Sequence, residues 1–118
     1  VSPEKLEAGI KTIQRNMDRQ VHRQTITGEQ RDAGMRRIKA AKSLSEFSSV
    51  EFAIEAATEK EDVKRRIFDE LCPKLPKDAM LATNTSSISI TRLGTSTDRP
   101  EQFIGLHFMN PVPLMRLV

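Results

Sequence analysis

The residues of this 118-residue chain best suited to chemistry lie in its second half, where short apolar segments end. His107 follows the apolar run that begins at Phe103 and precedes Phe108. The run Asn84-Thr85-Ser86-Ser87 follows another apolar segment and offers amide and hydroxyl hydrogen bonds. Because a histidine imidazole is well suited to accept a proton near neutral pH, these residues predict hydroxyl hydrogen bonding combined with proton abstraction.

A serine and a histidine also suggest a hydrolase. Ser86 and His107 have no aspartate in an obvious third position, and no nucleophile elbow surrounds Ser86. Acyl hydrolysis is therefore disfavoured. The residues alone leave a purely structural role open. A lone histidine in an apolar segment is commonly a core residue, and asparagine and serine are common turn residues.

A third polar segment follows the apolar run at 52–57. Ala57, Thr58 and Glu59 lead into a helix start, where free backbone N–H groups and the helix dipole favour oxygen-rich ligands. The Glu59 carboxylate could accept a hydrogen bond from a hydroxyl such as that of a ribose. Lys64 lies about one turn further on and could reach the same ligand, although both residues could equally be solvated surface residues.

Hydrophobic periodicity predicts the elements that must position these residues. We expect helices from Ser2 to about Val21 and from Thr27 to Ile38, where Thr27 and Gln30 form a capping box. Three strands are then expected, at 52–57, 79–82 and 103–108. The first two strands are separated by a helix that opens with Thr58 and Glu61 and ends at the prolines 73 and 76, and a short helix precedes the third strand.

The near-continuous apolar character of these strands predicts their arrangement. Strands that alternate with helices and lack polar residues at every second position favour a parallel sheet with helices on both faces, an α/β fold. In such sheets ligands bind at the carboxyl ends of the strands. The three polar segments all lie at predicted carboxyl ends, so we expect them at one edge of the sheet.

Composition excludes several classes of protein. Hydrophobic residues make up 37% of the chain, which is enough for a packed core, and no apolar run approaches the roughly 20 residues of a membrane span. The amino terminus lacks a signal-peptide pattern. The single cysteine, Cys72, excludes an internal disulfide and a cysteine-cluster metal site, so we expect a cytoplasmic protein without a metal.

The excess of positive charge lies near the amino terminus. The net charge is +3, and residues 1–42 hold ten lysines and arginines against five aspartates and glutamates. Nucleic-acid binding is nevertheless disfavoured, because the arginines are interleaved with acidic residues and the chain has no tyrosine or tryptophan for base stacking. A solvated helix face is favoured, and a basic patch for a small phosphorylated ligand remains open.

Glycine is scarce. The chain has five glycines, and no two of them lie close enough to form a phosphate-binding loop. A complete nucleotide-binding fold would need such a loop, so this feature alone argues against a self-contained nucleotide site.

Long motifs in the second half resemble a known family. The segments at 84–87, 103–113 and 115–118 resemble the 3-hydroxyacyl-CoA dehydrogenases and, within that family, most closely the bacterial enzymes for 3-hydroxybutyryl-CoA. The similarity covers the whole chain and is densest from Phe52 to Val118. It implies NAD-dependent oxidation of (S)-3-hydroxyacyl-CoA, with 3-hydroxybutyryl-CoA as the expected substrate, to the 3-oxoacyl-CoA.

The resemblance also implies roles for individual residues. His107 matches the family's catalytic base, and Ser86 matches the residue that hydrogen-bonds the substrate oxygen and also touches the cofactor. The positions that match NAD contacts are Ala57, Thr58, Glu59, Lys64, Asn84, Ser86 and Asn110. In the first helix, Asn16, Arg19 and Arg23 fall where the family approaches the CoA moiety of the substrate.

This chain departs from the family pattern at both ends. It lacks the first strand and the glycine-rich turn, a glutamate that the family places directly after the position of Val118, and the helical carboxyl-terminal domain that makes the usual homodimer contact. We therefore expect a partial Rossmann-type domain, residues 1–118, that is inactive alone. The alternative is a non-catalytic interaction or structural module that keeps only the fold.

Overall fold

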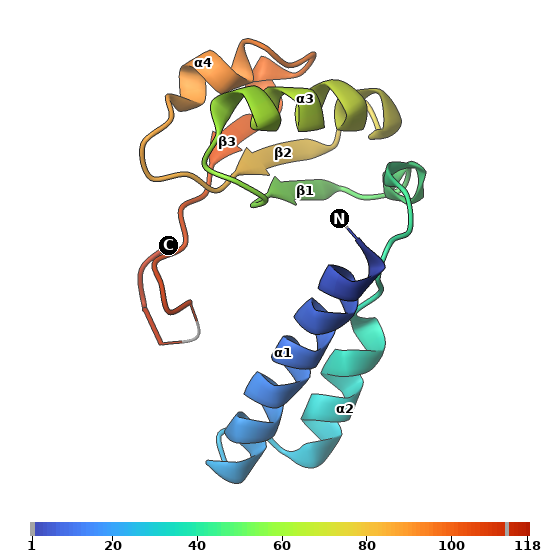
Figure 1. Cartoon of the computed structure of the whole chain (residues 1–118), viewed down its shortest axis with the longest axis vertical. Coiled ribbons are helices and arrows are strands. Elements are labelled where there is room, and N and C mark those ends of the chain that lie inside the picture. The colour runs from blue at the N-terminus through green and yellow to red at the C-terminus, as the bar shows by residue number, and fades with distance from the viewer. Residues whose placement is uncertain (1, 113) are drawn as a thin grey trace. The chain divides into compact units, whose positions relative to one another are not determined.

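The computed structural model describes residues 2–112 and 114–118. Val1 and Pro113, the last residue of the motif at 103–113, lie outside the described residues. The chain forms two compact units, Val1–Lys42 and Ser43–Val118 (Figure 1).

The first unit consists of two helices, α1 (Pro3–His22) and α2 (Gly28–Arg37), as the sequence predicts. The Ser2 side chain caps α1, and Thr27 and Gln30 form the expected capping box of α2. The helices are joined by an ion pair between Arg31 and Asp18 at 2.8 Å.

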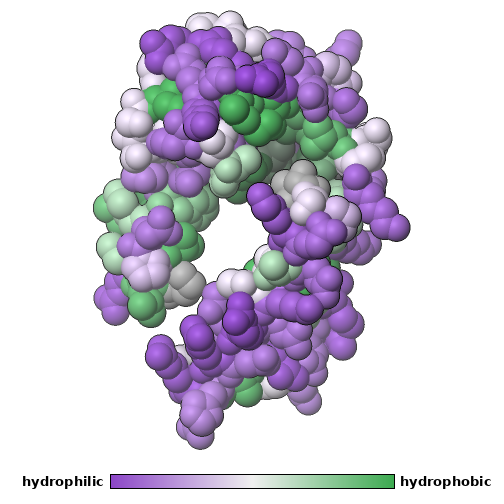
Figure 2. All heavy atoms as spheres, in the orientation of Figure 1, coloured by the Kyte–Doolittle hydropathy of each residue, from purple (hydrophilic) through white to green (hydrophobic). Residues whose placement is uncertain are grey.

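The surface of this unit is mainly polar. Neither helix buries a residue completely, and Figure 2 shows mostly hydrophilic side chains over both helices. The helices approach closely at Gly34, where an added Cβ would lie 2.6 Å from the Met17 Cε. Apolar burial therefore contributes little to the stability of this two-helix unit. Its helix caps and its ion pair contribute a correspondingly larger share.

The second unit contains the predicted parallel sheet. Its strands are β1 (Phe52–Glu55), β2 (Met80–Thr83) and β3 (Phe103–Gly105), in the order β1-β2-β3 with both pairings parallel. The α/β class and the parallel sheet are thus confirmed. The first and third strands end two and three residues earlier than predicted. Beyond their ends the Ala57 amide donates to the Glu55 carboxylate and the Phe108 amide to the Asn84 side chain, in place of a neighbouring strand's carbonyl.

Helices connect the strands. The main helix, α3 (Glu61–Leu71), links β1 to β2 and continues into the 3-10 turn η2 (Cys72–Lys74). Between β2 and β3 lie α4 (Ile90–Gly94) and η3 (Pro100–Gln102), and η1 (Leu44–Phe47) precedes β1. The expected cap of α3 by Thr58 and Glu61 is wrong: Lys60 is the N-cap, and the Thr58 hydroxyl accepts from the Lys60 amide at 3.2 Å.

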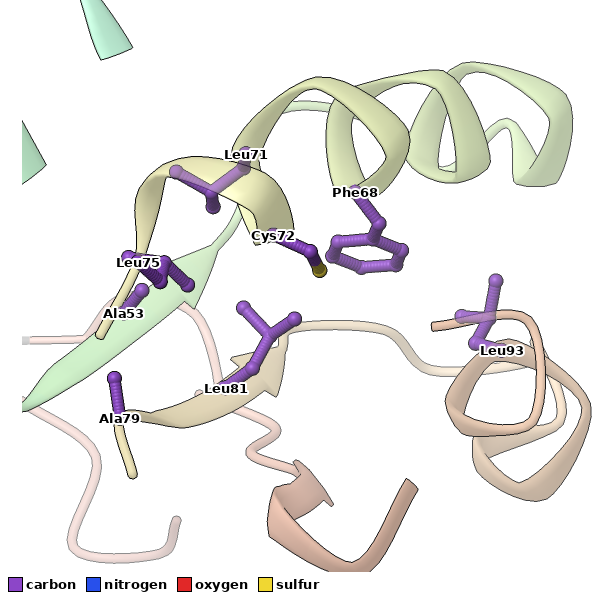
Figure 3. Close-up of a cluster of buried hydrophobic side chains, with 8 residues drawn as sticks. All are labelled: Ala53, Phe68, Leu71, Cys72, Leu75, Ala79, Leu81 and Leu93. Carbon is purple, nitrogen blue, oxygen red and sulfur yellow. The ribbon is translucent and has the colours of Figure 1, made fainter. Parts of the chain in front are cut away.

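The core lies between α3, η2, α4 and one face of the sheet. Phe68 of α3 meets Phe103 of β3 edge to face, with ring centroids 5.4 Å apart. Gly105 is required by close packing on this face, because an added Cβ would come within 2.8 Å of the Ile90 side chain. Figure 3 shows the buried cluster, which consists of Ala53, Phe68, Leu71, Cys72, Leu75, Ala79, Leu81 and Leu93.

The opposite face of the sheet keeps exposed apolar side chains. Phe52, Ile54, Met80 and Ile104 are each close to half exposed. The strand register places Phe52 beside Met80, and Ile54 and Ile104 on either side of Ala82, so these residues form one patch. The helices that this unit itself supplies therefore cover one face of its sheet.

A buried arginine fixes the chain where it enters β3. The Arg99 guanidinium donates to the carbonyl oxygens of Pro76 at 2.7 Å, Ala79 at 3.1 Å and Cys72 at 3.0 Å. Its side chain is only 4% exposed, and Asp98 pairs with its Nε at 2.9 Å. One side chain thus satisfies three carbonyls of the segment that leads from α3 into β2.

Arg99→Met should lower the free energy of unfolding by about 2 to 4 kcal/mol, because the buried Ala79 carbonyl loses its donor and the Pro76 and Cys72 carbonyls keep only a backbone amide each. Urea unfolding at pH 7 measures the change. The matched control is Arg66→Met, because Arg66 pairs with Asp62 on the helix surface and is 71% exposed. Equal losses of unfolding free energy in the two variants would show that the buried hydrogen bonds of Arg99 do not stabilise the fold.

Candidate functional site

The predicted chemical residues of the second unit lie at the carboxyl edge of the sheet. The last paired residues are Glu55, Thr83 and Gly105, which lie side by side in the register of the three strands. Ser86 lies three residues beyond Thr83, and His107 two residues beyond Gly105. Ser86 is exposed and His107 is half-buried. The edge therefore presents a hydroxyl and an imidazole on neighbouring strand ends.

A buried ion pair supports this edge from inside. The Lys64 Nζ lies 2.5 Å from the Glu55 Oε2, and the two side chains are 0% and 2% exposed. Lys64 also donates to the Thr83 hydroxyl at 3.1 Å and to the Asn84 carbonyl at 2.9 Å. All three ammonium donors are used, which compensates for removing this charge from water.

Glu55 is equally well satisfied. Its Oε2 also accepts from the Thr83 hydroxyl at 2.7 Å, and its Oε1 accepts from the Ala57 amide at 2.8 Å. The pair therefore joins β1, β2, α3 and the first residues after both strands.

This arrangement differs from the role predicted for Lys64. Lys64 lies on the inner face of α3 with Phe68 and Leu71, at helical spacing, and has no exposed area. A direct contact with a cofactor would require one of its three protein hydrogen bonds to break. In this structure Lys64 bonds the carbonyl of Asn84, at the start of the loop that carries Ser86, and its cofactor contact stays a prediction.

Glu59 organises the loop that carries Ser86. Its Oε1 accepts from the Thr85 hydroxyl at 2.6 Å, from the Ser86 amide at 2.8 Å and from the Ser86 hydroxyl at 3.2 Å. The Ser87 hydroxyl lies 3.5 Å from the same oxygen. Among the described residues none donates to the Oε2 of Glu59, so that oxygen remains available for a ligand hydroxyl.

These bonds stabilise the ionised form of Glu59. The hydrogen bond from Thr85, followed by that from the Ser86 amide, lowers the pKa of Glu59 from its ordinary value of 4.5 to about 2. The carboxylate therefore stays charged throughout the physiological range and keeps the loop in place.

The loop and the histidine segment are joined directly. The Phe108 amide donates to the Asn84 Oδ1 at 2.9 Å, next to His107 in the chain. The Leu106 amide donates to the Thr83 carbonyl at 3.0 Å. The backbone on both sides of His107 is thus held against β2 and its extension.

The remaining predicted residues lie in three places. Ala57 and Thr58 lie in the exposed to half-exposed turn between β1 and α3, and Asn110 is exposed beyond His107. Asn16, Arg19 and Arg23 lie on the first unit, at the end of α1, with Arg19 and Arg23 exposed. The structure assigns these residues no ligand, so their roles stay predictions.

Sequence reasoning missed Glu55, and it gave no role of their own to Thr83 or to Thr85, which it noted only within the polar run at 84–87. Each is buried and hydrogen-bonded at the edge. The available signal was a charged or hydroxyl residue within an otherwise apolar strand: Glu55 interrupts the run from Phe52 to Ala57, and Lys64 interrupts the apolar stripe of α3.

Within residues 2–112 and 114–118, no group of three or more histidine, cysteine, aspartate or glutamate residues could hold a metal ion. Across the same described ranges, no helix has the length and apolar character needed to cross a membrane.

Comparison with known proteins identifies what this arrangement resembles. The whole chain, residues 1–118, matches the family described as 3-hydroxyacyl-CoA dehydrogenase, NAD binding domain. A 3-hydroxybutyryl-CoA dehydrogenase from Bradyrhizobium diazoefficiens is 52% identical over all 118 residues, which correspond to 40% of its length. The fatty acid oxidation complex subunit alpha of Acinetobacter baumannii is 39% identical over 96% of this chain and 16% of its own.

Solved structures of similar proteins have the same fold as this chain. The crystal structure of (S)-3-hydroxybutyryl-CoA dehydrogenase from Ralstonia eutropha superposes with a TM-score of 0.94 at 36% identity, covering 98% of this chain and 41% of that one. The 3-hydroxybutyryl-CoA dehydrogenase from Escherichia coli gives 0.93 at 34% identity, over 98% of this chain and 25% of that one. The chain thus spans well under half the length of these proteins.

Lys64→Met should lower the free energy of unfolding by about 3 to 5 kcal/mol, because it leaves the buried Glu55 carboxylate without its partner. Adding Glu55→Gln should restore part of the loss, since the uncompensated charge disappears. Urea unfolding of the wild type, the two single variants and the double variant gives the coupling free energy between the Lys64 and Glu55 side chains.

The control for this cycle is Lys11→Met, whose partner Glu7 lies on an exposed helix face. Additive effects of the Lys64 and Glu55 substitutions would contradict a coupled buried pair.

Glu59 should titrate near pH 2 in the folded protein, and Thr85→Val should move that titration up toward 4.5 by removing the strongest hydrogen bond to the carboxylate. Because the folded pKa is lowered, the stability from these bonds is fully present above about pH 4.5 and is lost as the pH falls toward 2. Carbon-13 NMR of the glutamate carboxyl groups measures the pKa.

Thr95→Val is the matched control, because the Thr95 hydroxyl bonds only carbonyls of its own helix end. A wild-type Glu59 that titrates at 4.5 would show that the loop is not held as described.

Proposed function

This chain belongs to the family of 3-hydroxyacyl-CoA dehydrogenase NAD-binding domains, and we propose that it supplies most of the catalytic edge of an enzyme that oxidises (S)-3-hydroxyacyl-CoA, with 3-hydroxybutyryl-CoA as substrate, to 3-oxoacyl-CoA. The observation that carries this proposal is the hydrogen bond that joins the loop carrying Ser86 to the segment carrying His107, at the carboxyl ends of parallel strands: the Phe108 amide donates to the Asn84 side chain.

The residues at this edge suit a nicotinamide dinucleotide. Exposed hydroxyls, an open carboxylate oxygen on Glu59 and the exposed turn after β1 are groups that hydrogen-bond ribose and amide functions. When bound, NAD accepts a hydride from carbon 3 of the substrate. Ala57, Thr58, Glu59, Ser86 and Asn110 are the residues we place along it.

His107 and Ser86 act on the substrate hydroxyl. His107 accepts the hydroxyl proton as the carbon–oxygen double bond forms, and carbon 3 gives up its hydrogen as a hydride, so the alcohol loses one proton and one hydride. Ser86 hydrogen-bonds the substrate oxygen and keeps it oriented. Glu59 fixes the Ser86 amide, which holds the backbone of that serine, while its hydroxyl exchanges the longer bond to Glu59 for one to the substrate oxygen.

The acyl-CoA is proposed to meet the first unit as well. Arg19 and Arg23 are exposed and lie one helical turn apart, and Asn16 precedes them by another turn. Guanidinium groups bind phosphates well, so this end of α1 suits the phosphate groups of CoA.

Cellular setting and assembly complete the proposal. The lone buried Cys72 fits a reducing cytoplasm, and neither nucleic acid nor membrane is a proposed partner. The complete enzyme is proposed to be a homodimer through segments beyond this chain.

A chimera tests the function. Residues 1–118 replace the matching segment of the Bradyrhizobium diazoefficiens relative, and NADH formation from 3-hydroxybutyryl-CoA is followed by absorbance. The chimera should turn over, the 118 residues alone should not, and His107→Gln should lower kcat by about two to four orders of magnitude through loss of the general base.

His22→Gln is the control, because His22 is the other histidine of the chain and lies exposed on α1. Turnover by the isolated chain would refute its expected inactivity, and a His107→Gln chimera with full kcat would refute the role assigned to His107. A folded chimera without activity would favour the non-catalytic module.

A further inference from the structure

The ladder between β2 and β3 does not stop where β2 ends. In this parallel pairing the Leu106 amide donates to the Thr83 carbonyl. The next donor on the same side of the strand is the Phe108 amide, two residues on, and its ladder partner would be the carbonyl of Thr85. The chain after Thr83 turns away, however, because Glu59 holds Thr85 and Ser86.

A side chain supplies the missing acceptor. The Asn84 Oδ1 accepts from the Phe108 amide at 2.9 Å, a normal hydrogen-bond length. The amide side chain of Asn84 thus extends the ladder by one step, and the residue between the two bonded amides, Leu106 and Phe108, is His107.

Asn84 is itself fixed at its backbone. Its amide donates to the Glu55 carbonyl at 2.7 Å, and its carbonyl accepts from the buried Lys64 ammonium at 2.9 Å. Three of its polar atoms are therefore bonded to three different segments: the end of β1, helix α3 and the His107 segment. A side chain anchored in this way can hold another segment with little freedom of its own.

Within residues 2–112 and 114–118, no second hydrogen bond joins the Ser86 loop to the His107 segment. The Ser86 loop is held by Glu59, and the His107 segment leaves the sheet after Gly105. Among the described residues, the bonds from Leu106 to Thr83 and from Phe108 to Asn84 are the hydrogen bonds that hold the backbone between 106 and 109.

We propose that Asn84 is the positioning residue of His107: its Oδ1 holds the Phe108 amide, and its backbone is locked to the buried Lys64 and Glu55. The proposal rests on the proposed function for the role of His107, but the contact itself does not. It differs from the cofactor contact that the family resemblance implies for Asn84, because it requires an acceptor at this side chain and no donor.

Two substitutions separate an acceptor role from a donor role. Asn84→Asp keeps an oxygen acceptor of the same shape, whereas Asn84→Ala removes it. If Asn84 instead served the cofactor through its NH₂ group, both substitutions would lose that donor and both would raise the KM for NAD.

Hydrogen exchange tests the contact independently of activity. Amide exchange of Phe108 is measured by NMR or by mass spectrometry of short peptides, in the 118-residue chain and in the chimera. Phe108 should exchange at least about tenfold faster in Asn84→Ala than in wild type, and near the wild-type rate in Asn84→Asp. The Leu106 amide is the internal control, because its bond to the Thr83 carbonyl does not use the Asn84 side chain.

Steady-state kinetics of the chimera test whether loss of this contact impairs catalysis by His107. Asn84→Ala should lower kcat by about 10- to 100-fold, as expected for a displaced general base, with the KM for NAD unchanged. Asn84→Asp should recover most of that kcat. Unchanged exchange of Phe108 in Asn84→Ala would overturn the proposal, as would equal losses in both variants with a raised KM for NAD.

A wild-type chimera that folds but does not turn over would reject the proposed function alone. The exchange rates of Phe108 would then still decide whether Asn84 holds the His107 segment.

Discussion

The buried ion pair between Lys64 and Glu55 is the interaction on which the rest of the site depends. Two full charges lie in a region that excludes water, which is unfavourable unless geometry and hydrogen bonding are nearly complete. Here every donor of the ammonium is used, and both carboxylate oxygens accept bonds. The pair needs the ends of β1 and β2 and the first turns of α3 in one arrangement, so it favours that arrangement over alternatives.

Beyond the strand ends, side chains provide the hydrogen-bond acceptors that neighbouring backbone provides within the sheet. Each strand is short: β1 ends at Glu55 itself, and β2 ends at Thr83, which lies beside Glu55 in the register. Beyond that point Glu59 takes over as acceptor for the amide and hydroxyls of the Ser86 loop, while Asn84 takes over as acceptor for the Phe108 amide. A strand that ends early frees its polar groups for a ligand, and the acceptor side chains prevent those groups from becoming disordered.

Much of the fold could be predicted from the sequence, because apolar runs and helix caps are local signals. The three strands, α3 and the capping box at Thr27 follow from such signals. The burial of Lys64 could not be predicted in that way, because it depends on Glu55, nine residues earlier, and on Thr83, nineteen residues later. The positions of His107 and Ser86 at one edge followed from the parallel sheet, whereas the acceptor groups that hold their segments required the three-dimensional register.

Stability and chemistry are therefore linked at this edge. Glu59 was expected to hold a ligand hydroxyl, yet one of its oxygens already serves the loop, so the same carboxylate can meet a ligand only through the other. A ligand that bonds this second oxygen also strengthens the ionised state on which the loop depends, because hydrogen bonds to the charged form favour it. Binding and loop order would then reinforce each other through one side chain, while the buried charges of Lys64 and Glu55 keep the base of the loop fixed.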